Sequence, residues 1–399
     1  MLLSSTHEDM MQKPRFALAL LVACALPLSA LSGCTKPPPA EAKPAAAATP
    51  AAPKASDPAC VGRPATSPEE KLSLGAATYV RKGSTLSLEG AGDADDEFVL
   101  GQITDIKDHN PDNAANLKAV VEWMVAQKVD AIAVTGDLGE TADSVEKVLR
   151  DVAAAKVPVL TVVGNRECKD HFTQGVVAAQ KDNPNVINMN TIRVFNTDDL
   201  SVVSMPGYYN RAYLHCADGC EYMPEDVRAL PEVAKAATAP VRVLISHGPP
   251  LQTGPLAIDR IHEGANVGDP TLTEVMQANP QLFPFGLFGN IQEAGGYATD
   301  LTGQTRVAQD TFADAFVLNP GPLDAVRWVM LDNTESVGMA GLVKFKGKQA
   351  MYKVHRLQPG AAKAAPAPGG AAPAPGGAAP APAPGGAAAP APASPAPAK

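Results

Sequence analysis

The sequence has no basic cluster and few aromatic residues. Its 399 residues carry a formal net charge of −9, with 33 Lys and Arg against 42 Asp and Glu, and only 5% are Phe, Trp or Tyr. Proteins that bind nucleic acid need a positively charged face, often with aromatic side chains on which bases stack. We therefore expect no nucleic-acid partner.

Two segments have no large apolar side chains to bury. Residues 34–58 are rich in Ala and Pro, and residues 359–399 repeat the pattern APAPGG. Such compositions cannot offset the entropy of ordering the chain. We expect residues 34–58 to be a tether, reaching roughly 70 Å if largely polyproline II. Residues 359–399 are expected to be a disordered tail, a spacer or a segment that contacts the cell wall, which leaves one large domain at 59–358.

The N-terminal hydrophobic run is too short to span a membrane. Lys13 and Arg15 precede FALALLVACALPLSA, and LSGC follows, ending at Cys34. A basic head, a short apolar run and a small-residue cleavage site are typical of a secretory signal. LSGC resembles the lipobox of bacterial lipoproteins, in which the Cys is acylated. The resemblance implies a signal peptide at 1–33, lipidation of Cys34, and an exported protein anchored through that lipid in the bacterial cell envelope, facing the periplasm or the cell surface. The alternative is an ordinary signal peptide with an unmodified Cys.

Cysteine is scarce, with six residues in the whole chain. Cys24 lies in the signal and Cys34 is the lipidation site, so four remain in the folded domain: Cys60, Cys168, Cys216 and Cys220. An even number in an exported protein predicts two disulfides. The short Gly-containing spacing of HCADGC favours Cys216–Cys220 and, by elimination, Cys60–Cys168. The competing interpretation is a Cys-x3-Cys metal site, although no second Cys/His pair adjoins it.

Strand and helix patterns alternate in the first half of the domain. Buried-strand patterns at 98–105, 130–137 and 157–165 are separated by helical spacing of apolar residues at 113–129 and 141–157, with Thr141 as a helix N-cap. This order predicts right-handed crossovers and a parallel start to the sheet. The second half is richer in strands and predicts two packed sheets with helices outside. Its strand patterns lie at 186–208, 241–250, 282–296, 314–323, 327–333 and 341–357.

Five strand patterns end in a tight turn that carries a small polar group. The turns read TDIKDH, TGDLGE, VGNRE, SHGPP and FGNIQE, and they contain Asp105, Asp137, Asn165, His247 and Asn290. Ligands of α/β sheets lie beyond the carboxyl ends of the strands, so these five residues are expected to meet at one site. Asp and Asn at strand ends also cap helices and form Asx turns, which is the alternative for each residue taken alone.

From about Phe98 to Leu357 this series resembles the calcineurin-like metallophosphoesterases. Members of that family carry D-x-H, G-D, G-N-H-[DE], H and G-H-x-H at successive strand ends. The resemblance implies an α+β fold, a four-layer αββα sandwich of the metallo-dependent phosphatase type. It also implies two metal ions that share one Asp and clamp a phosphoester between them.

The chain departs from the family pattern at four histidines. Lys107 replaces the first, and Arg166 replaces the one that acts on the leaving group in the family. Asn290 and Gln292 replace the last two. Asp105, Asp137, Asn165, Glu167 and His247 match the family pattern.

The resemblance therefore implies two altered metal positions. The first would have Asp105, Asp137, Lys107 and Gln292, and the second Asp137, Asn165, His247 and Asn290. An ammonium has no lone pair for a metal, so Lys107 is expected to take the place of the first ion, paired with Asp105 and Asp137. The second position is expected to hold one divalent ion weakly (Mn, Fe or Zn) or none. His109 is a candidate substitute ligand.

Arg166 has the planar fork that suits phosphate or carboxylate. Its alternative is a structural salt bridge to Glu167, Asp170 or Glu293. The loop at 261–269 is expected to place His262 and Glu263 over the cleft, with an ordinary loop salt bridge as the alternative. Trp123 and Trp328 are assigned to the core.

Three functional hypotheses follow. The first is an envelope-anchored phosphoesterase-like domain that binds a phosphorylated or anionic ligand, or a protein partner, with little or no hydrolysis. The second is a phosphoester hydrolase that uses one metal ion and Lys107, with Arg166 neutralising charge in the transition state. The third is a cell-wall spacer without a ligand in the cleft, which the polar strand ends disfavour.

Overall fold

The computed structural model describes Cys60 and residues 69–74, 77–90, 92–93 and 95–358. All of these residues belong to one compact unit, within Ala55–Lys399. The signal peptide, Cys34, the tether and the C-terminal tail lie outside the described residues, so these remain predictions. Within the described part, no helix has the length and hydropathy needed to cross a membrane.

A six-stranded sheet is built around four parallel strands. Its order is β18-β17-β4-β5-β6-β7, and β17 and β18 form an antiparallel hairpin beside β4. The strands are β4 (Glu97–Ile103), β5 (Ala131–Thr135), β6 (Val159–Val162), β7 (Val186–Asn188), β17 (Met339–Lys346) and β18 (Gln349–Arg356). The crossover helices are α1 (Pro111–Ala126), α2 (Ala142–Ala153) and α3 (Lys169–Gln180). Thr141 caps α2 as predicted, because its side chain accepts a hydrogen bond from Ser144 N.

A ten-stranded mixed sheet lies against the first. Its order is β1-β2-β3-β8-β9-β10-β11-β14-β12-β13, with parallel pairing from β9 to β14. The strands are β1 (Glu70–Leu74), β2 (Ala77–Lys82), β3 (Thr85–Leu88), β8 (Val194–Asn196), β9 (Leu200–Met205), β10 (Val241–Ser246), β11 (Phe285–Leu287), β12 (Tyr297–Thr299), β13 (Arg306–Val307) and β14 (Phe316–Asn319). Short helices α4 (Pro224–Arg228), α5 (Leu230–Val233) and α6 (Pro270–Ala278) follow β9 and β10. A separate hairpin pairs β15 (Trp328–Val329) with β16 (Glu335–Ser336).

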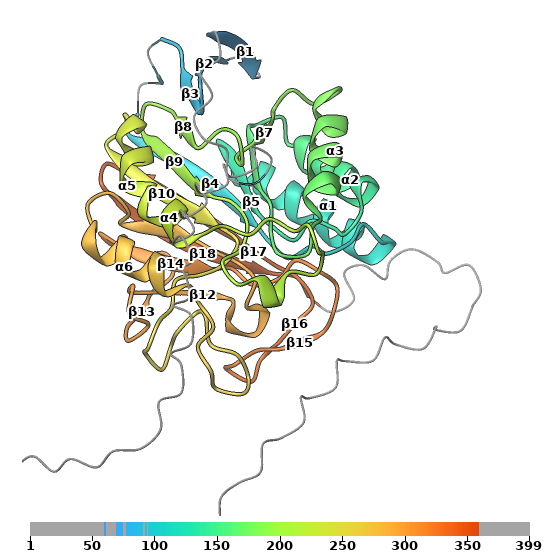
Figure 1. The fold of residues 1–399 in the computed structure, drawn as a ribbon, viewed down its shortest axis with the longest axis vertical. Coiled ribbons are helices and arrows are strands. Elements are labelled where there is room, and N and C mark those ends of the chain that lie inside the picture. Colours follow the sequence, from blue (N-terminus) through green and yellow to red (C-terminus); the bar gives the residue numbers. More distant parts are fainter. Residues whose placement is uncertain (1–59, 61–68, 75–76, 91, 94, 359–399) are drawn as a thin grey trace, which may run out of the picture. The chain divides into compact units, whose positions relative to one another are not determined.

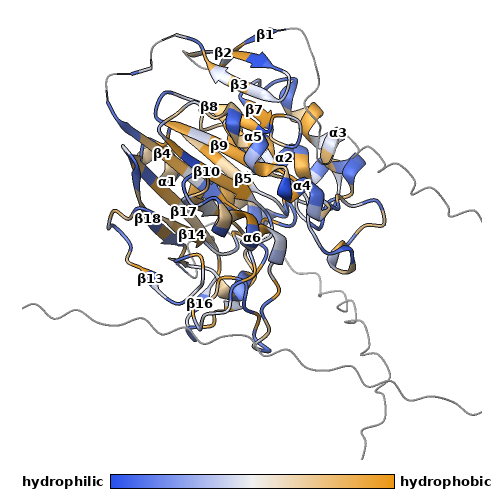
Figure 2. Cartoon of the chain, turned by 60° about the vertical axis from the view of Figure 1, so that its left-hand side comes forward, coloured by the Kyte–Doolittle hydropathy of each residue, from blue (hydrophilic) through white to orange (hydrophobic). Residues whose placement is uncertain are grey.

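The alternation of side chains along each strand produces four layers. In β5, Ala131 and Ala133 face a core shared by the two sheets, whereas Ile132 and Val134 pack with the helices. Successive side chains of a strand point to opposite faces, so one strand serves two cores. The helices α1–α3 and α4–α6 flank the two sheets, and the apolar residues gather on the central strands (Figures 1 and 2). The predicted αββα sandwich is confirmed.

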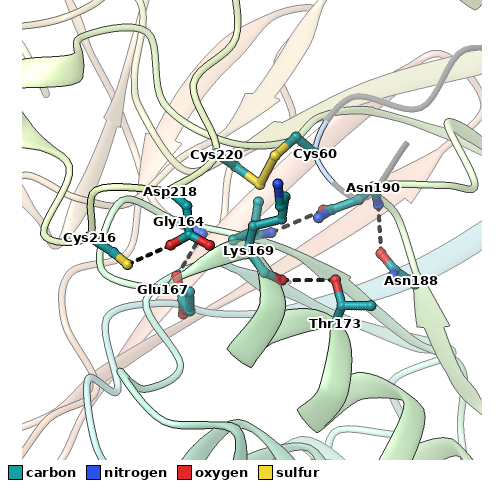
Figure 3. The surroundings of a disulfide bond; sticks show 11 residues. Cys60, Gly164, Glu167, Lys169, Thr173, Asn188, Asn190, Cys216, Asp218 and Cys220 are labelled. Atoms are coloured by element: carbon teal, nitrogen blue, oxygen red, sulfur yellow. Dashed lines mark hydrogen bonds between the residues drawn. A yellow bond between two sulfur atoms is a disulfide. The ribbon is translucent and has the colours of Figure 1, made fainter. Parts of the chain in front are cut away.

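The predicted disulfide pairing is wrong, although all four cysteines are bonded. The bonds are Cys60–Cys220 and Cys168–Cys216. An antiparallel bridge between Cys168 and Gly219 carries the loop after Cys216 across the start of α3, which brings the Cα atoms of Cys168 and Cys216 to 5.3 Å. Cys220 is buried and meets Cys60, well apart from Cys216 (Figure 3). Sulfurs held in disulfides offer no thiolate, so the Cys-x3-Cys metal site is also wrong.

Candidate functional site

Strand ends from both sheets meet at one place, as predicted. Asp105 follows β4, Asp137 follows β5 and His247 follows β10. One ligand atom from each lies within 4.8 Å of the others, and all three residues are buried. Asn165 follows β6 and Asn290 follows β11, and both contact this group directly. The carboxyl ends of the strands therefore supply a compact polar cluster inside the fold.

The backbone is strained at this cluster. Four of the eight non-glycine residues with positive φ in the described part of the chain belong to it: Asp105 (55°), Lys107 (67°), Asp137 (57°) and Asn290 (67°). Left-handed backbone costs on the order of 1 kcal/mol for a residue with a Cβ, and such strain gathers at functional sites. Hydrogen bonds from Asp105 N to Gly136 O and from Lys107 N to Asp137 O, 3.2 and 2.7 Å, hold the turns.

Asp137, Asn165 and His247 form a three-residue constellation. His247 Nε2 lies 2.8 Å from Asn165 Oδ1 and 3.2 Å from Asp137 Oδ1, and its Nδ1 lies 2.8 Å from Thr135 O. The Asn165 amide nitrogen donates to Tyr213 O at 2.7 Å, which leaves its oxygen facing the imidazole. A backbone carbonyl at Nδ1 fixes the tautomer that presents Nε2, as it does for metal-binding histidines.

The oxygens that face the two ring nitrogens of His247 all act as hydrogen-bond acceptors. A positive charge between them is therefore favoured. Burial by itself lowers the pKa of His247, but the charges of Asp137 and Asp105 outweigh burial and raise it. An imidazolium would donate from both ring nitrogens to these oxygens. A divalent ion bound by Nε2 and the two side-chain oxygens would meet the same need.

Glu167 has a role that the sequence did not reveal. Its side chain is fully buried, and its carboxylate accepts hydrogen bonds from the backbone N–H groups of Leu138, Gly139 and Gly164. Burial, together with the charge of Asp137, raises its pKa to about 7. Glu167 thus ties the turn after β5 to the turn after β6. Its match to the family motif identified the residue but not these bonds.

At the first metal position that the resemblance implies, both oxygens of Asp105 accept hydrogen bonds. Asp105 Oδ2 accepts from the hydroxyl of Thr104 and from Asn290 N, both at 2.9 Å. Asp105 Oδ1 accepts from the amide nitrogen of Gln292 at 2.6 Å. Gln292 therefore presents an N–H group, not a ligand oxygen, to the carboxylate. These donors compete for the oxygens through which Asp105 would bind an ion, although each carboxylate oxygen has more than one lone pair.

Lys107 does not take the place of the first ion, so that prediction is wrong. Its Nζ lies 2.7 Å from Asp324 Oδ2 and 4.3 Å from the centre of the Trp328 ring. Trp328 Nε1 donates to the other oxygen of Asp324 at 2.8 Å. The buried carboxylate and the aromatic face together stabilise the ammonium away from the strand ends. Trp328 is thus only half-buried and contacts a cation, contrary to its assignment to the core.

Arg166 contacts different carboxylates from those expected. Its Nη1 lies 2.8 Å from Glu140 Oε1, and its Nε lies 3.5 Å from Asp137 Oδ2. Its predicted alternative partners, Glu167, Asp170 and Glu293, are therefore wrong. Arg166 and Lys107 both line a cavity of about 520 Å³ beside the cluster, which we call the strand-end cavity. Its other charged residues are Asp108, Asp112, Glu140 and Asp324.

Two further expectations, for His109 and for the loop at 261–269, fail on geometry, and Asn290 makes an unforeseen contact. His109 Nε2 lies 2.8 Å from Asp151 Oδ2 on α2, so its ring does not serve as a ligand. Asn290 donates from its amide nitrogen to Tyr208 OH at 2.8 Å, a contact that the sequence did not indicate and that does not engage its side-chain oxygen, so its role as a ligand stays a prediction. His262 lines a different cavity, where its Nε2 lies 2.9 Å from Val329 O, and neither His262 nor Glu263 lines the strand-end cavity.

The two metal positions differ in how well their residues fit an ion. At the second, Asp137 and Asn165 offer oxygens and His247 offers a nitrogen, at the separations of about 3 Å that neighbouring ligands of a small divalent ion require. Asp137 Oδ1 also accepts hydrogen bonds from the backbone N–H groups of Asn165 and Arg166, both at 3.1 Å. At the first, Gln292 and Asn290 direct N–H groups at Asp105, and Lys107 is engaged elsewhere. The residues of the second position fit one ion, and at the first position the donors to Asp105 compete with an ion for its oxygens.

Comparisons with known proteins return structures only. No protein-family model and no curated protein matches the sequence. A dimetal phosphatase from Danio rerio shares 11% identity over 64% of this chain and 98% of its own, with a TM-score of 0.40. GAP50 of Plasmodium, described as the anchor in the inner membrane complex, shares 10% over 65% and 88%, with a TM-score of 0.42. Purple acid phosphatase PPD1 from Lupinus luteus seeds shares 11% over 69% and 56%, with a TM-score of 0.37. Because identities and TM-scores are this low, we base no conclusion about this chain on them.

Proposed function

We propose that the chain is a lipid-anchored envelope protein whose phosphoesterase-like domain binds a phosphorylated or other anionic ligand, with little or no hydrolysis. The observation that carries this proposal is the set of hydrogen bonds that the Asp105 carboxylate accepts. Its two oxygens accept from Thr104, Asn290 and Gln292, and these contacts support the proposal that the second ion of a two-metal phosphoesterase does not bind. Without two ions, attacking and leaving oxygens cannot both be held by metal.

The strand-end cavity is the proposed place for the ligand. Arg166 lies at its edge with 28% of its side chain exposed, and its partner Glu140 is 55% exposed. Exposed ion pairs of this kind are weak, so an incoming phosphate can replace the Glu140 carboxylate on the guanidinium. A phosphate accepts two parallel N–H bonds from such a planar fork.

Titration of the full chain with inorganic phosphate in a calorimeter tests this proposal. Arg166→Gln should weaken binding at the strand-end cavity by about tenfold, the loss of one charge-assisted bidentate contact. Arg211→Gln is the matched control, because Arg211 makes an exposed pair with Glu221. Equal phosphate binding by wild type, Arg166→Gln and the control would refute a ligand at Arg166.

A single-metal phosphoester hydrolase is the second candidate. The convergence of Asp137, Asn165 and His247 favours it, since these residues fit one divalent ion. Such an ion would supply Lewis-acid polarisation of a phosphoryl oxygen. Of the chain's own residues, His247 is oriented by Thr135 O, and Arg166 is placed to neutralise charge on a bound phosphate. Hydrolysis of a simple phosphodiester that disappears in Asp137→Ala would establish this candidate over the first.

Anchoring is proposed from the LSGC motif alone. Intact-mass analysis of the mature protein should find the N-terminal residue to be an acylated Cys34, and Cys34→Ser should release the protein from the membrane fraction. Cell-wall contact through residues 359–399 is the accompanying proposal. A mature N-terminus elsewhere than Cys34 would remove the lipoprotein interpretation.

A further inference from the structure

A second cavity, of about 310 Å³, is lined by cations and lies outside the strand-end cluster. Its charged and aromatic lining consists of Arg260, His262, Tyr297, Arg306 and Asp332, and we call it the arginine pocket. The rest of its wall is aliphatic and includes Leu256 and Ile261. It shares no lining residue with the strand-end cavity.

The arginines of this pocket have no carboxylate partner. Among the residues that the structure describes, no carboxylate oxygen lies within 4.0 Å of the guanidinium of Arg260 or Arg306. The only acceptor of Arg260 among the described residues is the backbone oxygen of Pro255, 3.5 Å from Nη1, and Arg306 interacts with the Tyr352 hydroxyl. Arginines without a carboxylate partner on a concave surface have N–H groups left to bind an anion.

Neighbouring acids do not pair with these arginines because other donors hold them. Asp259 accepts hydrogen bonds from Gln252 N, Gly268 N and the Asn266 amide. Asp332 accepts from both the backbone N–H and the hydroxyl of Thr334, at 3.0 and 2.6 Å. The acids are thus held in local turns, and no described carboxylate pairs with either guanidinium group.

Short backbone pairings fix the main chain at both arginines, and Arg306, which is exposed, also contacts an aromatic ring. Arg306 belongs to β13, pairs with Thr299 of β12, and has its Cζ 4.4 Å from the centre of the Tyr297 ring. Arg260 pairs with Asn266 across an antiparallel bridge. A cation held over an aromatic face loses less freedom on binding, so the pocket is preorganised for a negative group.

Arg356 adds positive charge beside the pocket. Gly296, with a φ of +97°, lets it approach, because a Cβ there would lie 2.5 Å from Arg356 Nη2. Burial raises the pKa of Asp332, but hydrogen bonds from Thr334 and the charges of Arg356 and Arg306 outweigh burial and lower it. The lowered pKa supports a positive potential at this position.

We infer that the arginine pocket is a second anion-binding site that takes the phosphate group of a small molecule. Arg260 and Arg306 bind the phosphate oxygens with their N–H groups, and the aliphatic wall contacts an organic remainder when one is present. This site is independent of the one proposed at Arg166, because neither arginine touches the strand-end cluster.

The test isolates the pocket by working in the full chain with Arg166→Gln. Inorganic phosphate and phenyl phosphate are titrated at constant ionic strength in a calorimeter, while the imidazole signals of His262 are followed by NMR. We expect binding to persist in this background, with shifts at His262. Adding Arg306→Gln or Arg260→Gln should weaken it by about tenfold. Arg327→Gln, which removes an exposed partner of Glu335, is the matched control and should change affinity less than about twofold.

The two probes distinguish the source of the phosphate. Tighter binding of phenyl phosphate indicates a phosphoester ligand, and equal affinity indicates free phosphate. The inference is overturned if neither probe binds in the Arg166→Gln background, or if binding there is unchanged by Arg260→Gln together with Arg306→Gln. Loss of phosphate binding with Arg166→Gln alone overturns the inference and leaves the proposal for the strand-end cavity standing.

Discussion

The strand-end cavity and the arginine pocket each contain two cationic side chains, but only the first pair is neutralised. Lys107 pairs with the buried Asp324, and Arg166 pairs with Glu140. No described carboxylate pairs with Arg260 or Arg306. A cation that holds a buried carboxylate stabilises the fold, whereas a cation without one is available to a ligand. The residue type alone does not separate these roles; the neighbouring acids do.

Removal of Lys107 should give the largest effect on stability. The side chain of Asp324 is 2% exposed, so Lys107→Met would leave a buried charge without its partner. We expect the free energy of unfolding to fall by about 3 kcal/mol, measured by urea denaturation. Lys107→Met with Asp324→Asn should recover much of the loss. A change below about 0.5 kcal/mol in the single variant would contradict the structural role of this pair.

The strand-end cluster should also make stability depend on pH. The folded-state pKa values of Glu167 (about 7) and His247 are both raised, so the folded chain holds these protons more tightly than the unfolded chain. Their stabilisation is present at low pH and is lost as pH rises through the folded pKa values.

We therefore expect the free energy of unfolding of the chelator-treated protein to fall by on the order of 2 kcal/mol between pH 5 and about pH 8. The pKa of Asp137 is also raised, by its burial. Glu167→Gln should make that decline shallower, because one of the three titrating groups is gone. Urea denaturation curves of wild type and Glu167→Gln at four pH values measure this decline in the free energy of unfolding. Stability that rises with pH over this window would contradict the burial of Glu167.

Removal of the carboxylate partner of Arg166 should leave the strand-end cavity with an arginine that has lost its closest acidic partner, similar to the arginines of the arginine pocket. Glu140→Gln removes the carboxylate at 2.8 Å from Arg166, so phosphate no longer competes with it. We expect phosphate affinity to rise by about threefold to fivefold, with an effect on folding of under about 1 kcal/mol. Calorimetry on wild type and Glu140→Gln measures the change. Weaker binding in the variant would mean that Glu140 helps to place the ligand.

The smallest effect on stability should come from the arginine pocket. Arg260→Gln breaks no ion pair and should change the free energy of unfolding by less than about 0.5 kcal/mol. Urea denaturation beside Lys107→Met gives the direct contrast. A loss comparable to that of Lys107→Met would show that Arg260 has a structural role, and the distinction between the two regions would fail.

The sequence predicted which residues meet but not what they contact. Strand periodicity and the polar turns placed Asp105, Asp137 and His247 together, because parallel strands bring their ends to one edge. The partner of Lys107, by contrast, comes from a loop more than 200 positions away, which no local pattern encodes. The same holds for Cys60 and Cys220, which are 160 residues apart.

Several elements also went unrecognised in the sequence. Helix α3 follows the polar turn at Asn165 without a side-chain cap hydrogen bond, so it lacked a clear start signal. Strands β12 and β13, which carry Tyr297 and Arg306, have three and two residues and are too short for periodicity to detect. The sequence therefore did not predict the arginine pocket, which forms only when the fold brings these segments together.

The metal content of the full-length chain, purified with added manganese, tests the central claim most directly. Elemental analysis of wild type, His247→Ala and Gln292→Ala should find no more than one ion per chain. Any ion present should disappear in His247→Ala and remain in Gln292→Ala, because His247 belongs to the proposed ion site and Gln292 donates to Asp105. Two ions per chain in the wild type, or one that depends on Gln292, would contradict this account of the site.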